Sequence, residues 1–485
     1  MKKRKKFYIT TSIAYANASP HIGFALELVE ADAIARYRRS FGDDVFFLTG
    51  TDEHGEKISR VVCSSGMTPK AFTNKISKEF RSLKTELNLS PDDFIRTSDK
   101  KRHWPGALAL WKRIEENGDI YKKKYKGLYC VGCEKFITKK ELVDGRCPIH
   151  KTEPEIIEEE NYFFKLSNYR DEVYKLIESG KYLILPESRK NEVLSFLSTG
   201  LEDISFSRSR ENLSWGIPIP KSDQTMYVWC DALSNYISAL GFGRKGGSLR
   251  RFNKFWPADI HLIGKDILRF HAVIWPAMLM SAKLPLPKKL LVHGFITAGG
   301  VKMSKSLGNV VYPGEIVRKY GVDPTRYYLL REIPSNEDGD FSEEKFVERY
   351  TADLANGLGN FASRVLNLGA ESAFRGERIS EATELQIKRA KAMVDKHMEE
   401  FRIHEAMASI WELLKFGDGY TNETKPWKTK DKKVIFDLLM ILENAAGLLE
   451  PFLPETSKKI KKCFRRRGGY LRVSKIKPLF PRIES

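Results

Sequence analysis

Residues 7–55 read FYITTSIAYANASPHIGFALELVEADAIARYRRSFGDDVFFLTGTDEHG, and this stretch decides the fold. The apolar runs Phe7–Thr11 and Val45–Thr49 have the length and composition of buried strands. Between them, Ser19 offers an N-cap and Pro20 a first helical residue, so we expect a helix that runs to about Arg39. A strand, a helix and a second strand in this order are typical of a Rossmann-like, doubly wound parallel α/β sheet.

Two later apolar runs, Ile260–Ile263 and Leu290–Val292, have the character of strands of the same sheet. We therefore expect the sheet to be split by an insertion over about 116–220. Ligands of such sheets bind at the carboxyl ends of the strands. Polar residues stand at these ends, namely Asp52, Gly264–Asp266 and His293–Gly294.

The last third of the chain has a different pattern. No proline occurs between Pro334 and Pro426, and apolar residues such as Ala406, Ile410 and Leu413 recur at helical spacing, which predicts an all-α bundle. The expected segments are 1–115 and 221–295 for the two halves of the sheet domain, 116–220 for the insertion, 296–350 for a loop region and 351–485 for the helical domain.

The charge balance points to an acidic partner. In 485 residues, Lys and Arg total 82 and Asp and Glu total 63, a formal net charge of +19 that favours a polyanion such as nucleic acid. No apolar run approaches the roughly 18 residues that cross a bilayer. The basic Met1–Lys6 is followed at once by a strand, which leaves no room for a leader, so we expect a cytoplasmic protein.

Four metal-ligand residues stand close together in the insertion, within 126–150. Two residues separate Cys130 from Cys133, and two separate Cys147 from His150; three thiolates with one imidazole suit tetrahedral zinc. The alternative is a pair of disulfides or unrelated thiols, which a chain without secretory features does not favour. Because four ligands leave no open position, we expect a structural zinc ion that helps a small insert to fold.

Two segments look suited to hold a polyphosphate. His21 and Gly23 open a helix whose N-terminus offers free N–H groups and the positive end of its dipole. Lys302 and Lys305 lie on a loop behind a hairpin that we expect to turn at Gly299–Gly300. Alone, each would be an ordinary helix-end histidine or solvated lysine, but together they predict a site where phosphate charge develops in a transition state.

These motifs resemble those of a known family. His21–Phe24 and Lys302–Ser306 are similar to the HIGH and KMSKS signatures of class I aminoacyl-tRNA synthetases. Further stretches resemble the methionyl-tRNA synthetases, in that family's order: Tyr15–Asn17, Thr49–Gly55, Tyr227–Ala232, Gly264–Ile267 and Val292–Gly294. The single zinc knuckle resembles the family's smaller form. The resemblance implies that the chain activates L-methionine with ATP and Mg²⁺ to methionyl-adenylate and pyrophosphate, then transfers methionine to the 3′ end of elongator and initiator tRNA(Met).

The resemblance also implies roles for individual residues. It implies a methionine site of Ile13, Tyr15, Asp52, Trp229, Ala232, Leu233, Tyr236, Ile267 and His271, in which Asp52 faces the ammonium group. It implies ATP binding by His21, Gly23, Glu27, Asp266, His293, Gly294 and Lys305, with His21, Lys302 and Lys305 catalytic. Arg208 matches an arginine near the family's active site, and either an ion pair or a substrate contact is open for it. The aromatic residues suit a thioether, which makes sulfur–aromatic contacts.

In the helical domain, Asn360, Arg364 and Trp427 resemble the family's anticodon-reading residues. Asn360 and Arg364 are four apart and so share a helix face, and an exposed tryptophan can stack on an unpaired base. By the same resemblance, 296–350 holds the lysine loop and a tRNA stem-contact region. The basic segment Lys458–Arg467 is either a solvated face or an edge that meets RNA.

The chain departs from the family pattern at Phe24, where a second histidine is usual. Loss of such a donor typically costs about 3 kcal/mol, so either another group substitutes or activation is slower. No further tRNA-binding module follows the bundle, and we expect a monomer. Two other functions compete: a synthetase for another apolar amino acid, for which this length lacks the large editing insertion, and an RNA-binding paralogue without catalysis, which Phe24 alone supports.

Overall fold

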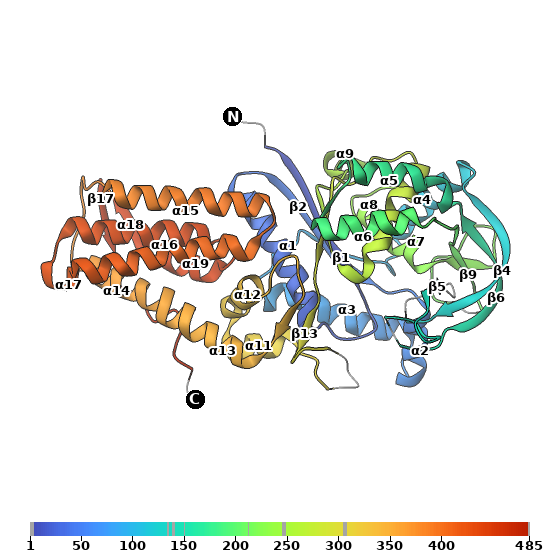
Figure 1. Ribbon diagram of the computed structural model, residues 1–485, viewed down its shortest axis with the longest axis horizontal. Coiled ribbons are helices and arrows are strands. Elements are labelled where there is room, and N and C mark those ends of the chain that lie inside the picture. The colour runs from blue at the N-terminus through green and yellow to red at the C-terminus, as the bar shows by residue number, and fades with distance from the viewer. Residues whose placement is uncertain are drawn as a thin grey trace. The chain divides into compact units, whose positions relative to one another are not determined.

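The computed structural model describes residues 4–132, 135–137, 141–149, 151–211, 213–244, 249–303 and 308–483 (Figure 1). The chain divides into two compact units, which we describe separately. The sheet unit comprises Met1–Pro20, Gly42–Ser82 and Pro91–Val292. The helical unit comprises His21–Phe41, Leu83–Ser90 and His293–Ser485.

A six-stranded sheet in the order β3-β2-β1-β11-β12-β7 forms the centre of the sheet unit. Its strands are β1 (Lys6–Tyr15), β2 (Asp44–Asp52), β3 (Asp93–Arg96), β7 (Leu183–Leu185), β11 (Ile260–Gly264) and β12 (Lys289–His293). β1 pairs in parallel with β2 and β11, which confirms the Rossmann-like α/β prediction. Both leading strands run further than predicted, because a register irregularity after Thr10 lets β1 continue beside β2.

One edge of this sheet was not predicted. β7 comes from within 116–220 and pairs in parallel with β12, Ile184 opposite Leu290, so that segment is not wholly separate from the sheet. The rest of the segment builds an antiparallel sheet in the order β5-β4-β6-β8. These strands are β4 (Ile120–Cys130), β5 (Lys135–Ile137), β6 (Glu155–Phe164) and β8 (Ile204–Ser205). β9 (Ser207–Ser209) and β10 (Gln224–Met226) form a separate antiparallel pair.

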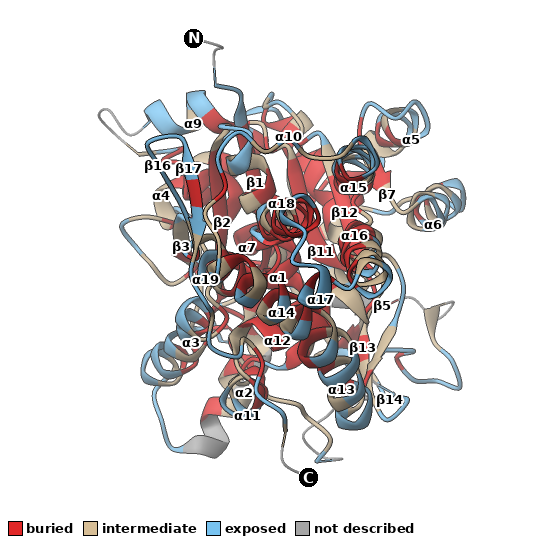
Figure 2. Cartoon of the chain, turned by 90° about the vertical axis from the view of Figure 1, so that its left-hand side faces the viewer, coloured by how far each residue is buried: buried red, intermediate tan, exposed pale blue. Residues whose placement is uncertain are grey.

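Helices cover the sheet and complete a single large apolar core, whose members include Trp111, Tyr236 and Trp275. The helices of this unit are α2 (Glu56–Ser65), α3 (Pro69–Glu86), α4 (Trp104–Glu116), α5 (Arg170–Glu178), α6 (Glu187–Ser198), α7 (Val228–Leu233), α8 (Asn235–Ser238), α9 (Leu249–Phe255) and α10 (Trp275–Ser281). Short non-α turns are Leu166–Tyr169, Lys265–Ile267 and Phe270–Ile274. Figure 2 shows β1, β2, β11 and β12 buried along most of their length, as expected for parallel strands.

The helical unit begins with the predicted first helix, α1 (Ile22–Ser40), but its start differs from the prediction. His21, not Ser19, is the N-cap, since its backbone is extended and its ring Nδ1 accepts the N–H of Gly23 at 3.1 Å. A side chain at Gly23 would have its Cβ 3.0 Å from the His21 ring. The glycine therefore leaves room for this cap.

The predicted hairpin is present. β13 (Ile296–Ala298) and β14 (Val301–Lys302) pair antiparallel around Gly299 and Gly300, whose φ angles of 63° and 74° lie in the left-handed region. β15 (Gly339–Phe341) joins β13 in parallel.

The remaining helices confirm the all-α bundle, to which an unpredicted hairpin of β16 (Phe464–Arg467) and β17 (Tyr470–Val473) is added. They are α11 (Pro313–Tyr320), α12 (Val322–Arg331), α13 (Glu343–Arg349), a π-helix (Tyr350–Gly359), α14 (Asn360–Ala370), α15 (Glu381–Glu399), α16 (Ile403–Thr424), α17 (Pro426–Thr429), α18 (Lys432–Leu449) and α19 (Pro454–Lys461). Within the described ranges, no helix combines the length and the apolar character that a bilayer span requires.

A buried ion pair ties α1 to this unit. Arg326 on α12 is fully buried and contacts Asp32 of α1 at 2.9 Å. Its guanidinium also donates to the carbonyl oxygens of Leu87, Pro451 and Phe452. Three separate stretches of chain thus converge on one side chain, and its donors are satisfied as a buried charge requires.

We expect Arg326→Met to lower the free energy of unfolding by about 3 kcal/mol, because the carboxylate of Asp32 stays buried without its main counter-charge. Urea unfolding followed by circular dichroism measures the change. The matched control is Lys388→Met, which removes an exposed ion pair with Glu384 and should change stability by less than about 0.5 kcal/mol. Equal effects of the two substitutions would contradict the role of Arg326.

Candidate active site

The carboxyl ends of β1 and β2 bring two predicted methionine-site residues together. Tyr15 and Asp52 are direct partners in the parallel register, and the N–H of Ala16 donates to the carbonyl oxygen of Asp52 at 2.8 Å. The Asp52 side chain is buried, and the hydroxyl of Thr97 donates to its Oδ1 at 3.3 Å. The structure thus brings the predicted carboxylate and the predicted aromatic residue together at the ends of two neighbouring strands.

Tyr236 and His271 form a buried hydrogen-bonded pair. The Nδ1 of His271 lies 3.1 Å from the carbonyl oxygen of Ile267, which can only accept, so Nδ1 carries the proton. Burial lowers the pKa of His271 to about 4, against the smaller effect of the Ile267 hydrogen bond. The neutral ring therefore accepts a hydrogen bond at Nε2 from the Tyr236 hydroxyl, 2.7 Å away. The hydrogen-bonded pair as a whole carries no charge.

Trp229 packs beside the Tyr236–His271 pair. Its ring stacks on Phe270 with centroids 3.6 Å apart and planes 8° from parallel, and it meets His271 edge-on at 6.5 Å. Ala232 and Leu233 are buried on α7, while Ile13, Tyr15 and Ile267 are half-buried against the same core. The structure thus gathers the predicted methionine-site residues in the sheet unit, and adds Phe270, which sequence analysis did not name.

A second unpredicted group lies directly beside these residues. The buried carboxylate of Asp231 accepts from His54 Nδ1 at 2.5 Å and from His103 Nε2 at 2.6 Å. Burial opposes its ionisation, but the charge and hydrogen bonds of the two histidines outweigh burial and lower the pKa of Asp231. His54 and Asp231 belong to the Thr49–Gly55 and Tyr227–Ala232 motifs, whereas nothing in the sequence around His103 marked it.

In the helical unit, the start of α1 and the exit of the lysine loop lie together. The N–H of Ile22 donates to the carbonyl oxygen of Val311 at 2.9 Å. His21 is exposed, and Gly23 and Phe24 are half-buried. Lys302 belongs to β14 by its backbone, but its side chain and the whole of Lys305 lie outside the described residues.

Three buried titratable groups meet beside Gly294. His293 Nε2 lies 3.0 Å from Glu27 Oε2, and its Nδ1 lies 2.7 Å from the Gly294 carbonyl oxygen. Burial opposes protonation of His293, but the hydrogen bond and charge of Glu27, joined by the charge of Glu30, raise its pKa to about 9. Burial raises the pKa of Glu30 to about 8. The charge of Glu27 adds to this increase, and the charge of His293 opposes it.

Gly294 is required by its surroundings, because a Cβ there would lie 2.1 Å from the carbonyl oxygen of Glu337. Asp266 is exposed, two residues after Gly264 ends β11 in the sheet unit.

Arg208 on β9 is buried between the rings of Tyr129 and Tyr227, 5.0 and 4.8 Å from their centroids. Its guanidinium also donates to the Ser205 hydroxyl at 2.9 Å and to the Ser207 carbonyl oxygen at 2.7 Å.

The predicted anticodon residues are exposed. Asn360 and Arg364 lie on α14, and Arg364 is 3.8 Å from Asp418 of α16. α16 leads directly into α17, which carries Trp427 with 42% of its surface exposed. These side chains are accessible to a large partner.

Two of the four predicted zinc ligands are described. Cys130 and Cys147 are each 1% exposed and share one small cluster with Ile137. The chain turns back after Cys147, whose carbonyl oxygen accepts from Lys151 N at 2.8 Å and whose N–H donates to Thr152 O at 2.9 Å. Cys133 and His150 lie outside the described residues, and the described ones hold no group of three possible metal ligands.

Comparison with known proteins agrees with the fold and the site. The sequence model for tRNA synthetases class I (M) matches residues 7–154 and 137–366, and that for the anticodon-binding domain of tRNA ligases matches 384–475. A parallel sheet of this kind followed by a helical anticodon-binding domain defines a class I tRNA synthetase.

The curated relatives and solved structures are more specific. The methionine–tRNA ligase of Clostridium acetobutylicum is 44% identical over 516 aligned positions, which cover 100% of this chain and 79% of the relative. That of Brucella suis is 43% identical and covers 94% of this chain and 91% of itself. The Mycobacterium tuberculosis methionyl-tRNA synthetase in complex with methionyl-adenylate superposes with a TM-score of 0.92 at 38% identity, over 99% of this chain and all of that one. The chain therefore belongs to the methionine family of class I tRNA synthetases.

We expect the buried, neutral His271 to make stability depend on pH. The folded ring resists protonation down to a pKa of about 4, whereas the unfolded ring titrates at 6.5, so its contribution is lost as pH falls through 6.5 towards 4. Between about pH 7 and pH 5, the parent should lose about 2 kcal/mol more than His271→Gln. Urea unfolding at both pH values tests this, and an identical pH dependence in both proteins would refute it.

Proposed function

We infer that the chain joins L-methionine to tRNA(Met) in two steps, as the methionine family of class I tRNA synthetases does. In the first, a methionine carboxylate oxygen attacks the α-phosphorus of ATP, which enters with Mg²⁺, and pyrophosphate leaves. In the second, a hydroxyl at the 3′ end of tRNA attacks the carbonyl of methionyl-adenylate and AMP leaves. The main support for this inference is that Trp229, Tyr236 and His271 form an uncharged group of contacting side chains in a chain of this family.

In the methionine site, Asp52 pairs with the substrate ammonium group. Tyr15, Trp229 and Tyr236 surround the thioether, with which aromatic rings make favourable sulfur contacts. The neutral state of His271 supports this role, because a charged imidazole would disfavour an apolar side chain. Ile13, Ala232, Leu233 and Ile267 supply the remaining apolar contacts.

The proposed ATP-binding residues come from the start of α1, the turn after β11, the end of β12 and the lysine loop. His21 and Gly23 approach the phosphates, while Glu27, Asp266, His293 and Gly294 contact the nucleoside. Lys302 and Lys305 neutralise charge that develops as pyrophosphate leaves, which lowers the barrier more than it strengthens ground-state binding. Phe24 stands where relatives use a second histidine, so phosphate contacts rest on His21 and the two lysines.

The tRNA is read in the helical domain by Asn360, Arg364 and Trp427, whose exposure supports this role. Elongator and initiator forms share the anticodon and are both substrates. We divide the chain at 115, 220, 295 and 350, with 351–485 as the anticodon-binding domain. The enzyme acts as a monomer in the cytoplasm, where tRNA is charged.

A structural zinc ion is held by Cys130, Cys133, Cys147 and His150. The close burial of Cys130 and Cys147 and the tight turn after Cys147 fit this ligand set. Thiolates bound to zinc hold together an insert that has a very small core.

We expect one zinc ion per chain in the purified protein, measured by elemental analysis. Cys147→Ser should lose that ion, because three ligands hold zinc less tightly than four. Cys463→Ser, which changes a buried thiol outside the insert, should keep it and serves as the control. A metal-free parent protein would reject this site.

The activity is tested by exchange of labelled pyrophosphate into ATP. Exchange should require methionine, and Lys305→Ala should slow it about a hundredfold while tRNA affinity stays nearly constant. Exchange with another amino acid in place of methionine would favour a different specificity, and absence of any exchange would favour an RNA-binding protein without catalysis. An equal loss of exchange and tRNA affinity in Lys305→Ala would contradict the role of the loop.

A further inference from the structure

The β16–β17 hairpin presents an unusually basic face. Arg465 pairs with Arg472 and Arg467 with Tyr470, and partners directly opposite in an antiparallel ladder point to the same side. All four side chains are exposed, Tyr470 by 39%. The tight turn between the strands uses Gly468 and Gly469, with φ angles of 57° and 79°. One face therefore carries three arginines and one aromatic ring.

This arrangement costs stability in the absence of an anion. Like charges directly opposite each other on paired strands are destabilising, and Arg465 and Arg472 are such a pair. Among the described residues, no carboxylate lies within 4 Å of Arg465, Arg467 or Arg472. A bound polyanion would remove the repulsion between these arginines.

The opposite face of the hairpin is occupied by the protein itself. Leu471 is buried and exchanges two backbone hydrogen bonds with Phe374, at 2.8 and 2.9 Å. Arg466, which shares this side, makes a two-pronged ion pair with Glu443, each contact 2.5 Å long. The two faces thus separate arginines that are paired internally from arginines that are not.

The hairpin adjoins the end of the bundle that carries Trp427. Val473 approaches Gly369 near the end of α14, the helix on which Arg364 lies. Lys430, at the end of α17, pairs at 2.9 Å with Glu371, next to the end of α14. Figure 1 shows β17 and α17 at the same end of the bundle. A tRNA whose anticodon loop meets Trp427 therefore brings further backbone phosphates close to the hairpin.

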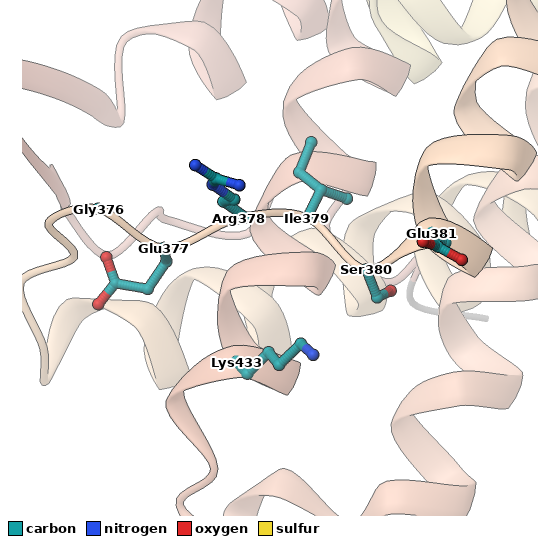
Figure 3. Close-up of a pocket in the computed structure, with 7 residues that line it drawn as sticks. All are labelled: Gly376, Glu377, Arg378, Ile379, Ser380, Glu381 and Lys433. Atoms are coloured by element: carbon teal, nitrogen blue, oxygen red, sulfur yellow. The ribbon is translucent and has the colours of Figure 1, made fainter.

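Arg375 extends the basic face. Its guanidinium lies 4.9 Å above the ring of Tyr470, and it donates to the Tyr470 hydroxyl at 3.1 Å. The neighbouring hollow of about 670 Å³, lined by residues 376–381 and Lys433, differs from this face (Figure 3). It carries Glu377 and Glu381 as well as Arg378 and Lys433, so its charges balance and it does not extend the basic surface.

We propose that the face formed by Arg375, Arg465, Arg467, Tyr470 and Arg472 binds the sugar-phosphate backbone of tRNA beside the anticodon loop. This inference rests on the proposed function for its ligand. The arginines contact phosphates and carry no base specificity, which remains with Asn360, Arg364 and Trp427. The hairpin therefore supplies affinity and orientation, and the α14–α17 residues supply discrimination.

The test is the salt dependence of tRNA binding. Log affinity falls linearly with log salt concentration, and each phosphate contact that is lost makes this negative slope smaller in magnitude by about one. The triple variant Arg465→Gln, Arg467→Gln, Arg472→Gln should lower the slope by about three, for tRNA(Met) and for a non-cognate tRNA alike. The corresponding triple lysine variant should keep the parent slope. Trp427→Ala should instead weaken discrimination between the two tRNAs and leave the slope nearly unchanged.

Arg466→Gln is the matched control, because it removes one charge from the same hairpin on the opposite face, and it should not change the slope. An unchanged slope in the glutamine triple variant would overturn the proposal and leave the face to a partner other than RNA. A reduction of about one in Arg466→Gln, the change expected for one lost phosphate contact, would also overturn it, because the effect would then not depend on which face carries the arginine. Methionine-dependent pyrophosphate exchange needs no tRNA, so its absence in the parent would reject the proposed function separately.

Discussion

Parallel pairing of β1 with β2 and β11 is the constraint on which the proposed methionine site depends. It places the carboxyl ends of three strands at one edge, with Tyr15 beside Asp52. The same register sets the hydroxyl of Thr10 2.7 Å from His261 Nδ1, and the His261 ring lies 4.2 Å from that of Tyr236. The position of Tyr236 is thus linked to the strand register through His261.

Buried polar groups make this site rigid. Tyr236 and His271 share a hydrogen bond, and Asp231 joins His54, in the Thr49–Gly55 segment, to His103. Such groups are costly unless they are paired, so each restricts the geometry of its neighbours. In the helical unit, Arg326 has the same effect on α1, because its donors reach four different acceptors. Both units therefore contain buried charges whose partners come from distant parts of the chain.

Much of the fold could be predicted because its signals are local. The apolar runs at Phe7 and Val45, the glycine pair at 299–300 and the helical spacing after Glu343 all correspond to observed elements. The prediction of Ser19 as the N-cap was wrong. The ring of His21 accepts the N–H of Gly23 instead, and this contact has no sequence pattern by which it could be predicted. β7 was missed because three residues carry too little periodicity. The β16–β17 hairpin lies in a basic stretch that resembles any solvated segment.

The sequence by itself determined the family and the residue types of the site, since these reside in short motifs such as His21–Phe24 and Thr49–Gly55. Only the tertiary structure decided how side chains distant in sequence combine. Burial in the core lowers the pKa of His271, whereas Glu27 and Glu30 raise the pKa of His293 against the effect of burial. Strand pairing likewise decided that Arg465 and Arg472 share one face. Burial, protonation and charge crowding depend on separations in space, and the order of residues in a chain does not contain those distances.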